Sequence, residues 1–146
     1  MIALIQRVSE AQVRVSEELV GAIERGVLAL IGVQRADSAA SAERLLERIL
    51  SYRVFPDTAG RMNESLRSVG GGLLLVPQFT LAADTHKGTR AGFSSAAEPA
   101  QARELFAHLL AQARNAYAPV SAGVFGAYMQ VALVNDGPVT FWLETR

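Results

Sequence analysis

The sequence predicts an α+β fold, a mostly antiparallel β-sheet with two helices packed on it. Apolar and polar residues alternate at both ends of the chain, which is typical of half-buried strands. Two segments in between repeat their apolar residues at helical spacing. The 146 residues show no repeat, low-complexity tract or linker, so we expect residues 1–146 to form a single domain.

The first half of the chain predicts strands and then a helix. "MIALIQRVSEAQVRV" alternates over one or two strands, and the polar "SEE" that follows predicts a hairpin turn. The continuous apolar run "GVLALIGV", residues 26–33, indicates a buried central strand. A helix is then predicted with Asp37 or Ser38 as its N-cap and a short strand at residues 52–55 after it. The apolar face of this helix consists of Ala42, Leu45, Leu46, Ile49 and Leu50.

The second half predicts a buried strand, a loop, a helix and closing strands. Residues 73–76 form the core of the strand, and residues 83–101 resemble an ordered surface loop. A helix is expected from Glu98 to about Tyr117, because Pro99 fits a first turn. Its apolar face consists of Leu105, Phe106, Leu109 and Leu110.

Composition excludes several kinds of function. Fourteen basic and fourteen acidic residues cancel, which argues against broad electrostatic adhesion to nucleic acid or membrane but allows contact with one end of an RNA. The chain has no cysteine and only two histidines, so we expect no disulfide, metal site or cofactor. Without a signal peptide or a run long enough to cross a bilayer, a cytoplasmic protein is expected.

The stretch "VPQFTLAADTHKGTR" holds one candidate nucleophile and a small cationic cluster. Thr80 follows a buried strand, and a nucleophilic threonine needs a base within hydrogen-bond reach. His86 is the histidine near it in sequence, so the alternative is that Phe79 and Thr80 simply end the strand. Lys87 and Arg90 suit either a solvated surface or a phosphate contact.

The last strand, "MQVALVNDGPVTFWLE", is interrupted by Gly137-Pro138. Proline donates no N–H to a sheet, and glycine weakens a strand interior. One interpretation is a bulge or tight turn in an edge strand. The other is a cis peptide whose carbonyl oxygens face a ligand with no bulky side chain in the way.

Taken together, these segments resemble the bacterial D-aminoacyl-tRNA deacylase family. The resemblance rests on "MIALIQRVSEAQVRV", "QFTLAADTHKGTRAGFS" and "MQVALVNDGPVTFWLE", in the order and spacing of that family, and it covers essentially the whole chain.

The resemblance implies a homodimer with a barrel-like β core, outer helices and an active site at the dimer interface. It implies that Gly137-Pro138 is cis and reaches into the pocket of the other subunit, and that Arg7 helps to hold this peptide. The predicted catalytic residues are Gln78, Phe79 and Thr80. The predicted substrate-binding residues are Arg7, Pro77, Met129, Gly137 and Pro138.

The chain departs from the family pattern at two places. Pro77 stands where the family usually has serine, which removes a hydroxyl and a backbone N–H. Ala91-Gly92 stands where the family usually has Pro-Ser, so that loop is expected to be more mobile. Pro77 could also mark a member with an altered substrate.

The implied activity is hydrolysis of the ester of D-aminoacyl-tRNA, and of glycyl-tRNA, with help from the tRNA ribose hydroxyl. The Gly-Pro carbonyls would exclude the L form by steric clash. Backbone N–H groups near Phe79 and Thr80 could stabilise the oxyanion. Two alternatives stay open: a dimer that binds an RNA end without catalysis, and an esterase with Thr80 as nucleophile.

Overall fold

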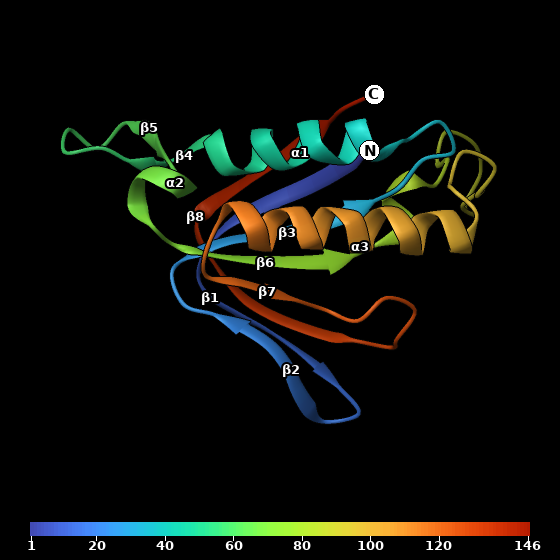
Figure 1. Cartoon of the computed structure of the whole chain (residues 1–146), viewed down its shortest axis with the longest axis horizontal. Coiled ribbons are helices and arrows are strands. Elements are labelled where there is room, and N and C mark those ends of the chain that lie inside the picture. Colours follow the sequence, from blue (N-terminus) through green and yellow to red (C-terminus); the bar gives the residue numbers. More distant parts are fainter.

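The computed structural model describes residues 1–146 and confirms the predicted α+β fold with a nearly closed, barrel-like sheet (Figure 1). The elements are β1 (Ile2–Val15), β2 (Glu18–Ile23), β3 (Gly26–Gly32), α1 (Ala39–Ser51), β4 (Arg53–Pro56), β5 (Met62–Ser65), α2 (Leu66–Val69), β6 (Gly72–Pro77), η1 (Phe79–Ala82), α3 (Pro99–Ala116), β7 (Val120–Ala122) and β8 (Gln130–Glu144).

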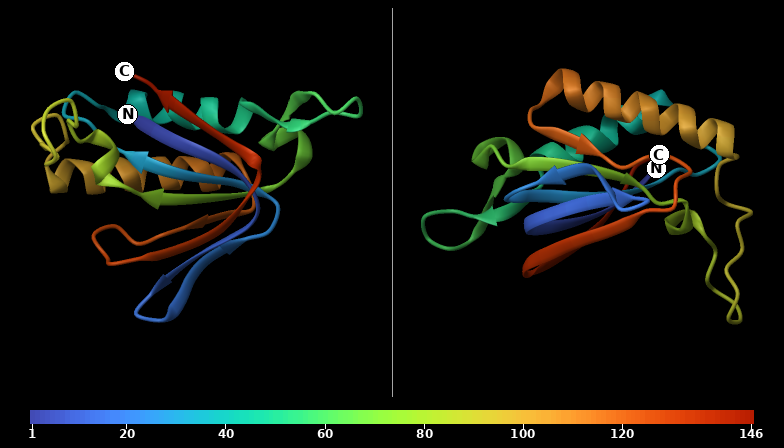
Figure 2. Two further views of the ribbon diagram at one scale, coloured as in Figure 1. Left: turned by 180° about the vertical axis from the view of Figure 1, so that it is seen from behind. Right: turned by 90° about the horizontal axis from the view of Figure 1, so that it is seen from below.

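The main sheet has the strand order β2-β1-β3-β6-β7, and β8 pairs with β1. β1 is antiparallel to β2, β3 and β8, whereas β6 is parallel to both β3 and β7. The sheet curls until β2 approaches β7 (Figure 2). There the Ser121 hydroxyl donates to the Ala22 carbonyl at 3.1 Å, and a Cβ at Gly21 would lie 2.8 Å from the Ala122 oxygen.

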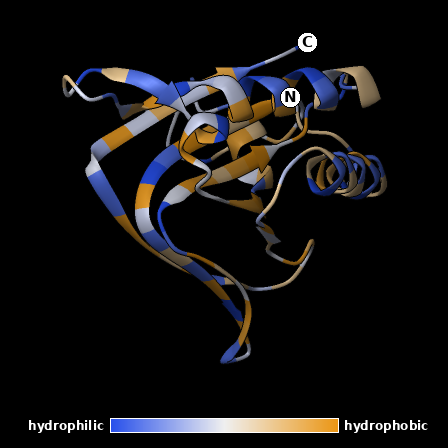
Figure 3. Cartoon of the chain, turned by 60° about the vertical axis from the view of Figure 1, so that its left-hand side comes forward, coloured by the Kyte–Doolittle hydropathy of each residue, from blue (hydrophilic) through white to orange (hydrophobic).

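Two apolar clusters hold the sheet. Helices α1 and α3 lie on one face of it, where the larger cluster forms (Figures 1 and 2). All five residues predicted for the apolar face of α1 are buried. The smaller cluster fills the curl formed by β1, β2, β3, β6 and β8. Figure 3 shows the hydrophobic and hydrophilic bands that alternate along the long strands.

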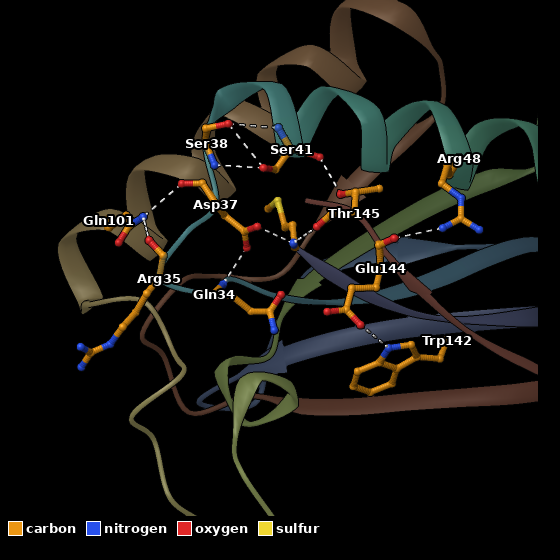
Figure 4. Close-up of polar contacts among 11 residues, drawn as sticks. Gln34, Arg35, Asp37, Ser38, Ser41, Arg48, Gln101, Trp142, Glu144 and Thr145 are labelled. Carbon is orange, nitrogen blue, oxygen red and sulfur yellow. Dashed lines mark hydrogen bonds and ion pairs between the residues drawn. The ribbon is translucent and has the colours of Figure 1, made fainter.

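The start of α1 is tied to both chain ends. Ser38 is the N-cap, and its side chain exchanges hydrogen bonds with Ser41 in a capping box. Asp37, the other predicted cap, instead pairs with the fully buried ammonium of Met1 at 2.5 Å and accepts the N–H of Gln34 at 2.7 Å. Figure 4 shows Thr145 beside this pair, where its hydroxyl donates to the Ser41 carbonyl at 2.9 Å.

The structure differs from the sequence prediction in three features. The β6 strand ends at Pro77, so Phe79 and Thr80 do not end a strand but begin the short η1 helix. Residues 66–69 form the unpredicted helix α2. The chain also contains a cis peptide at Ala118-Pro119 that the sequence did not predict.

No helix reaches the length and apolar character needed to cross a bilayer.

Candidate active site

A pocket of about 450 Å³ opens where β6 ends. Its walls come from the β6–η1 corner, the start of α3, the segment before β8, and β8 itself. The lining contains no aspartate, glutamate, histidine, lysine or arginine side chain. It consists of Val76, Pro77, Gln78, Phe79, Ala97, Pro99, Ala102, Phe125, Gly126, Ala127, Tyr128, Met129 and Val131.

The β6–η1 corner results from the sequence around Pro77. Residues 73–76 are buried and pair in parallel with β3, and Pro77 closes the ladder opposite Ile31. The next residue, Gln78, donates its N–H to the Ile31 carbonyl at 2.7 Å. Its own carbonyl accepts the N–H of Leu81, so the N–H groups of Phe79 and Thr80 precede the first helical donor of η1.

The side chains of this corner are open to solvent. Phe79 is 61% exposed, and its ring lies 5.3 Å from that of Phe93. The Thr80 hydroxyl accepts a hydrogen bond from Gln78 Nε2 at 2.6 Å. Pro77, Gln78 and Phe79 line the pocket, whereas Thr80 is exposed and does not.

His86 does not act as a base for Thr80 in this arrangement. Its Nδ1 lies 2.7 Å from Asp84 Oδ1, and the same carboxylate accepts the His86 N–H at 3.0 Å. These hydrogen bonds from His86 lower the pKa of Asp84, with the backbone N–H contributing most. The Thr80 hydroxyl has the Gln78 amide as its hydrogen-bond partner and no base. This geometry counts against the threonine-nucleophile alternative.

Met129 forms part of the pocket wall next to β6. Its Sδ accepts the Val124 N–H at 3.4 Å. A Cβ at Gly123 would lie 2.8 Å from Met129 Sδ and 3.4 Å from Pro77 Cδ, so a larger residue there would displace the Met129 side chain from this wall.

Residues 125–128 form a wall of the pocket that was not predicted from the sequence. Phe125 packs against Phe106 of α3, with ring centroids 6.4 Å apart, and Gly126 adopts a left-handed φ of +77°. The signal was the glycine- and aromatic-rich "GVFGAYM" before the last strand, which is typical of a shaped loop.

Gly137-Pro138 forms an exposed corner in β8. The peptide bond is cis, and residues 136–138 are exposed. In the β1–β8 ladder Gln6 pairs with Thr140 and Val8 with Asn135, so residues 136–139 bulge out opposite a single residue of β1. β8 pairs with β1 alone, so both sequence interpretations apply: an edge-strand bulge that contains a cis peptide.

Two side chains secure this Gly-Pro corner. Arg7 is the residue opposite the bulge, and its Nε donates to the Asp136 carbonyl at 2.8 Å while Nη1 donates to the Val54 carbonyl at 2.7 Å. Asn135 accepts the Val139 N–H at 2.7 Å and donates to Thr140 Oγ1 at 3.0 Å. The corner is therefore held by its own strand and by β1.

The Gly-Pro corner and the pocket are far apart within one chain. Val131 lines the pocket, and Gly137 follows six residues later along β8, which spans about 20 Å in an extended strand. The structure thus groups Pro77, Gln78, Phe79 and Met129 and leaves Arg7, Gly137 and Pro138 outside that group.

Lys87 and Arg90 lie on the exposed loop and form none of the ion pairs of the chain. No group of three or more His, Asp or Glu side chains is arranged to hold a metal ion.

Comparison with known proteins identifies the family. The family model described as D-Tyr-tRNA(Tyr) deacylase matches residues 4–144. A D-aminoacyl-tRNA deacylase of Thioalkalivibrio sulfidiphilus is 69% identical over 99% of this chain and 97% of that protein. Another, of Alkalilimnicola ehrlichii, is 66% identical over 100% of this chain and 97% of that protein.

Solved structures agree with the fold. The structure titled "c-Myc DNA Unwinding Element Binding Protein" has a TM-score of 0.95 and 39% identity, covering 100% of this chain and 99% of that chain. A probable eukaryotic D-amino acid tRNA deacylase has a TM-score of 0.82 over 98% of both chains, and at 14% identity it supports the fold alone.

The fold and the full-length matches place the chain among hydrolases of aminoacyl-tRNA. The chain belongs to the D-Tyr-tRNA(Tyr) deacylase family. Its activity is that of a D-aminoacyl-tRNA deacylase.

Proposed function

We propose that the chain hydrolyses D-aminoacyl-tRNA and glycyl-tRNA in an active site completed by two copies of the chain. The pocket of one copy would hold the ester beside Gln78 and Phe79. The Gly137-Pro138 corner of the other copy would close the pocket over the amino acid. The observation that carries this proposal is that the corner is exposed and lies outside the pocket of its own chain.

The exposed apolar side chains support a second copy as the missing part. Phe79, Val134 and Trp142 are each about half exposed or more, at 61%, 49% and 51%. Along β8 neither face is fully covered, because exposed and half-buried residues alternate over most of its length. Apolar surface of this kind is typical of a protein–protein interface.

The Gly-Pro corner suits selection by handedness. Its carbonyl oxygens would accept hydrogen bonds from the substrate ammonium and crowd one side of Cα. An L side chain would then collide with these oxygens, whereas a D side chain would point away from them. Glycine has no Cβ, so its ester should also be hydrolysed.

Hydrolysis would use parts that the pocket and the substrate offer. The N–H groups of Phe79 and Thr80 are candidates to stabilise the oxyanion, since they precede the first helical donor of η1. The pocket lining contains no carboxylate or imidazole to act as a base. We therefore assign assistance of the attacking water to the ribose hydroxyl next to the ester. A substrate with a deoxyribose terminal nucleotide should react orders of magnitude more slowly, and an unchanged rate would refute this assignment.

The remaining parts of the proposal concern location and contacts. Charged tRNA is a cytoplasmic substrate, so the protein would act in the cytoplasm. Lys87 and Arg90 are exposed cations available to the acceptor stem. Replacing both with alanine should weaken tRNA binding and flatten its salt dependence, and unchanged affinity would rule them out.

Mixing two inactive variants tests the shared site. Gly137→Ala damages the corner, and Ala127→Trp fills the pocket. Each variant alone should be inactive. Co-expressed subunits should regain about one quarter of the wild-type activity, because half of the random dimers then carry one intact site. A mixture as inactive as its components would mean that the site lies within one chain, or that the second copy plays no part.

The alternative of a non-catalytic RNA-binding dimer is tested by assaying the wild-type protein for hydrolysis. If this alternative holds, the wild-type protein would bind D-aminoacyl-tRNA without releasing the amino acid.

A further inference from the structure

A cation of α3 lies at the rim of the pocket. The guanidinium of Arg103 lies over the Phe125 ring, with Cζ 4.8 Å from the ring centroid. One of its nitrogens, Nη2, lies 3.3 Å from the position of a Cβ added to Gly126. Phe125 and Gly126 both line the pocket, as does Ala102 next to Arg103 on α3.

Arg103 has no acidic partner. It takes part in none of the six ion pairs of the chain, and its side chain forms no hydrogen bond within the chain. The residues at i±3 and i±4 on the helix are Pro99, Ala100, Phe106 and Ala107, and none of them carries a charge. Its side chain is therefore positioned by stacking on Phe125, and its N–H donors are available to a ligand.

The chemistry of the rim fits an anion and not the ester itself. The pocket lining carries no charged side chain, so the uncharged ester and the amino-acid side chain suit its interior. An aminoacyl ester in the pocket brings the phosphodiester of the terminal nucleotide toward the rim. A planar guanidinium held on an aromatic ring is well suited to bind phosphate oxygens.

We propose that Arg103 binds a backbone phosphate of the tRNA acceptor end and so makes the enzyme prefer a polynucleotide to a bare aminoacyl nucleoside. This role rests on the proposed function, because it assumes that the ester occupies the pocket beside Gln78 and Phe79. Arg103 is a specificity-determining residue here and takes no part in bond cleavage.

The test compares two substrates and three proteins. The substrates are D-tyrosyl-tRNA and 3′-O-D-tyrosyl-adenosine, which carries the same ester but no phosphate. The proteins are the wild type, Arg103→Gln, and Arg114→Gln as a matched control. Arg114 is an exposed arginine of the same helix, eleven residues or about 16 Å further along its axis.

Arg103→Gln should raise KM for D-tyrosyl-tRNA about five- to tenfold at low salt and leave kcat within about twofold. The slope of log KM against log salt should become shallower by about 0.7, the value for one contact to a single strand. Arg103→Gln should hydrolyse the adenosine ester at the wild-type rate, and Arg114→Gln should match the wild type on both substrates. Thermal unfolding should show that all three proteins are folded.

Two results would overturn the role of Arg103, and a third would concern the function itself. An Arg103→Gln enzyme unchanged on both substrates would mean that Arg103 does not contact the tRNA. An equal loss on both substrates would assign Arg103 to the nucleoside, the amino acid or the pocket structure. A wild-type protein inactive on D-tyrosyl-tRNA would refute the proposed function, whatever the variants do.

Discussion

Thr80→Ala distinguishes a catalytic hydroxyl from a hydroxyl that only holds Gln78. The exposed Thr80 Oγ1 accepts one hydrogen bond, at 2.6 Å from Gln78 Nε2. A neutral hydrogen bond of this kind contributes about 0.5–1.5 kcal/mol, and about 1.4 kcal/mol corresponds to a tenfold change in rate. We therefore expect Thr80→Ala to lose at most about tenfold in the rate of deacylation.

Loss of a true nucleophile would have a far larger effect. Removing the attacking group of a hydrolase costs on the order of 10⁴–10⁶ in rate. The two models thus differ by at least about a thousandfold, well beyond the scatter of the assay.

Single-turnover release of D-tyrosine from D-tyrosyl-tRNA, with enzyme in excess, measures the chemical step directly. Thr80→Val keeps the shape of the side chain without the hydroxyl, and Thr80→Ser keeps the hydroxyl. All three variants should stay within about tenfold of the wild type. Background rates for the alanine and valine variants, together with an active serine variant, would contradict this reasoning and restore Thr80 as the nucleophile.

Three further predictions concern the Gly-Pro corner and two ion pairs. Gly137→Ala should lower the single-turnover rate of deacylation at least a hundredfold, because φ of Gly137 is +150° and an added Cβ would lie 2.8 Å from its nearest neighbour. The melting temperature should fall only modestly, because the corner is exposed. A fully active variant would show that the corner plays no part in catalysis. Asp37→Asn should reduce the free energy of unfolding in urea by about 3 kcal/mol, because it leaves the buried ammonium of Met1 without its countercharge, and a loss under about 1 kcal/mol would contradict this. Glu47→Gln should cost less than about 1 kcal/mol at pH 7, since its ion pair with Arg67 is exposed. The hydrogen bond from Arg67 lowers the pKa of Glu47, so this small stabilisation is present above the usual carboxyl pKa and disappears as the pH falls through the lowered one; a gap between wild type and variant that widens in acid would show the opposite sign.

The sequence predicted the elements whose signal is local. Periodicity and turn residues within single segments predict both long helices, the hairpin with its turn at "SEE", and the buried strands. The interruption at Gly137-Pro138 was visible for the same reason, because the disruption of the strand pattern lies within four residues.

The pocket could not be predicted in this way. Its wall combines residues 76–79, 97–102 and 125–131, which approach one another only because β6 lies parallel to β3 and β7 in the same sheet. Parallel pairing depends on long crossover connections, and local periodicity does not encode which strands become neighbours. The resemblance to a family supplied Gln78, Phe79 and Met129, whereas Phe125 and Gly126 emerged only from the packing.

Arg103 illustrates the same limit. In the sequence it is one of two arginines on an amphipathic helix, and its spacing indicates a solvated position. Its significance arises from the Phe125 ring beneath it and from the lack of an ion-pair partner, and both are tertiary features.

The rates at which D-tyrosyl-tRNA and L-tyrosyl-tRNA are deacylated by the same enzyme preparation provide the most direct measurement. Main-chain oxygens at the Gly137-Pro138 corner that crowd one side of Cα should permit rapid release of D-tyrosine, while the L ester decays no faster than without enzyme. Equal release from both esters would show that the corner does not select by handedness.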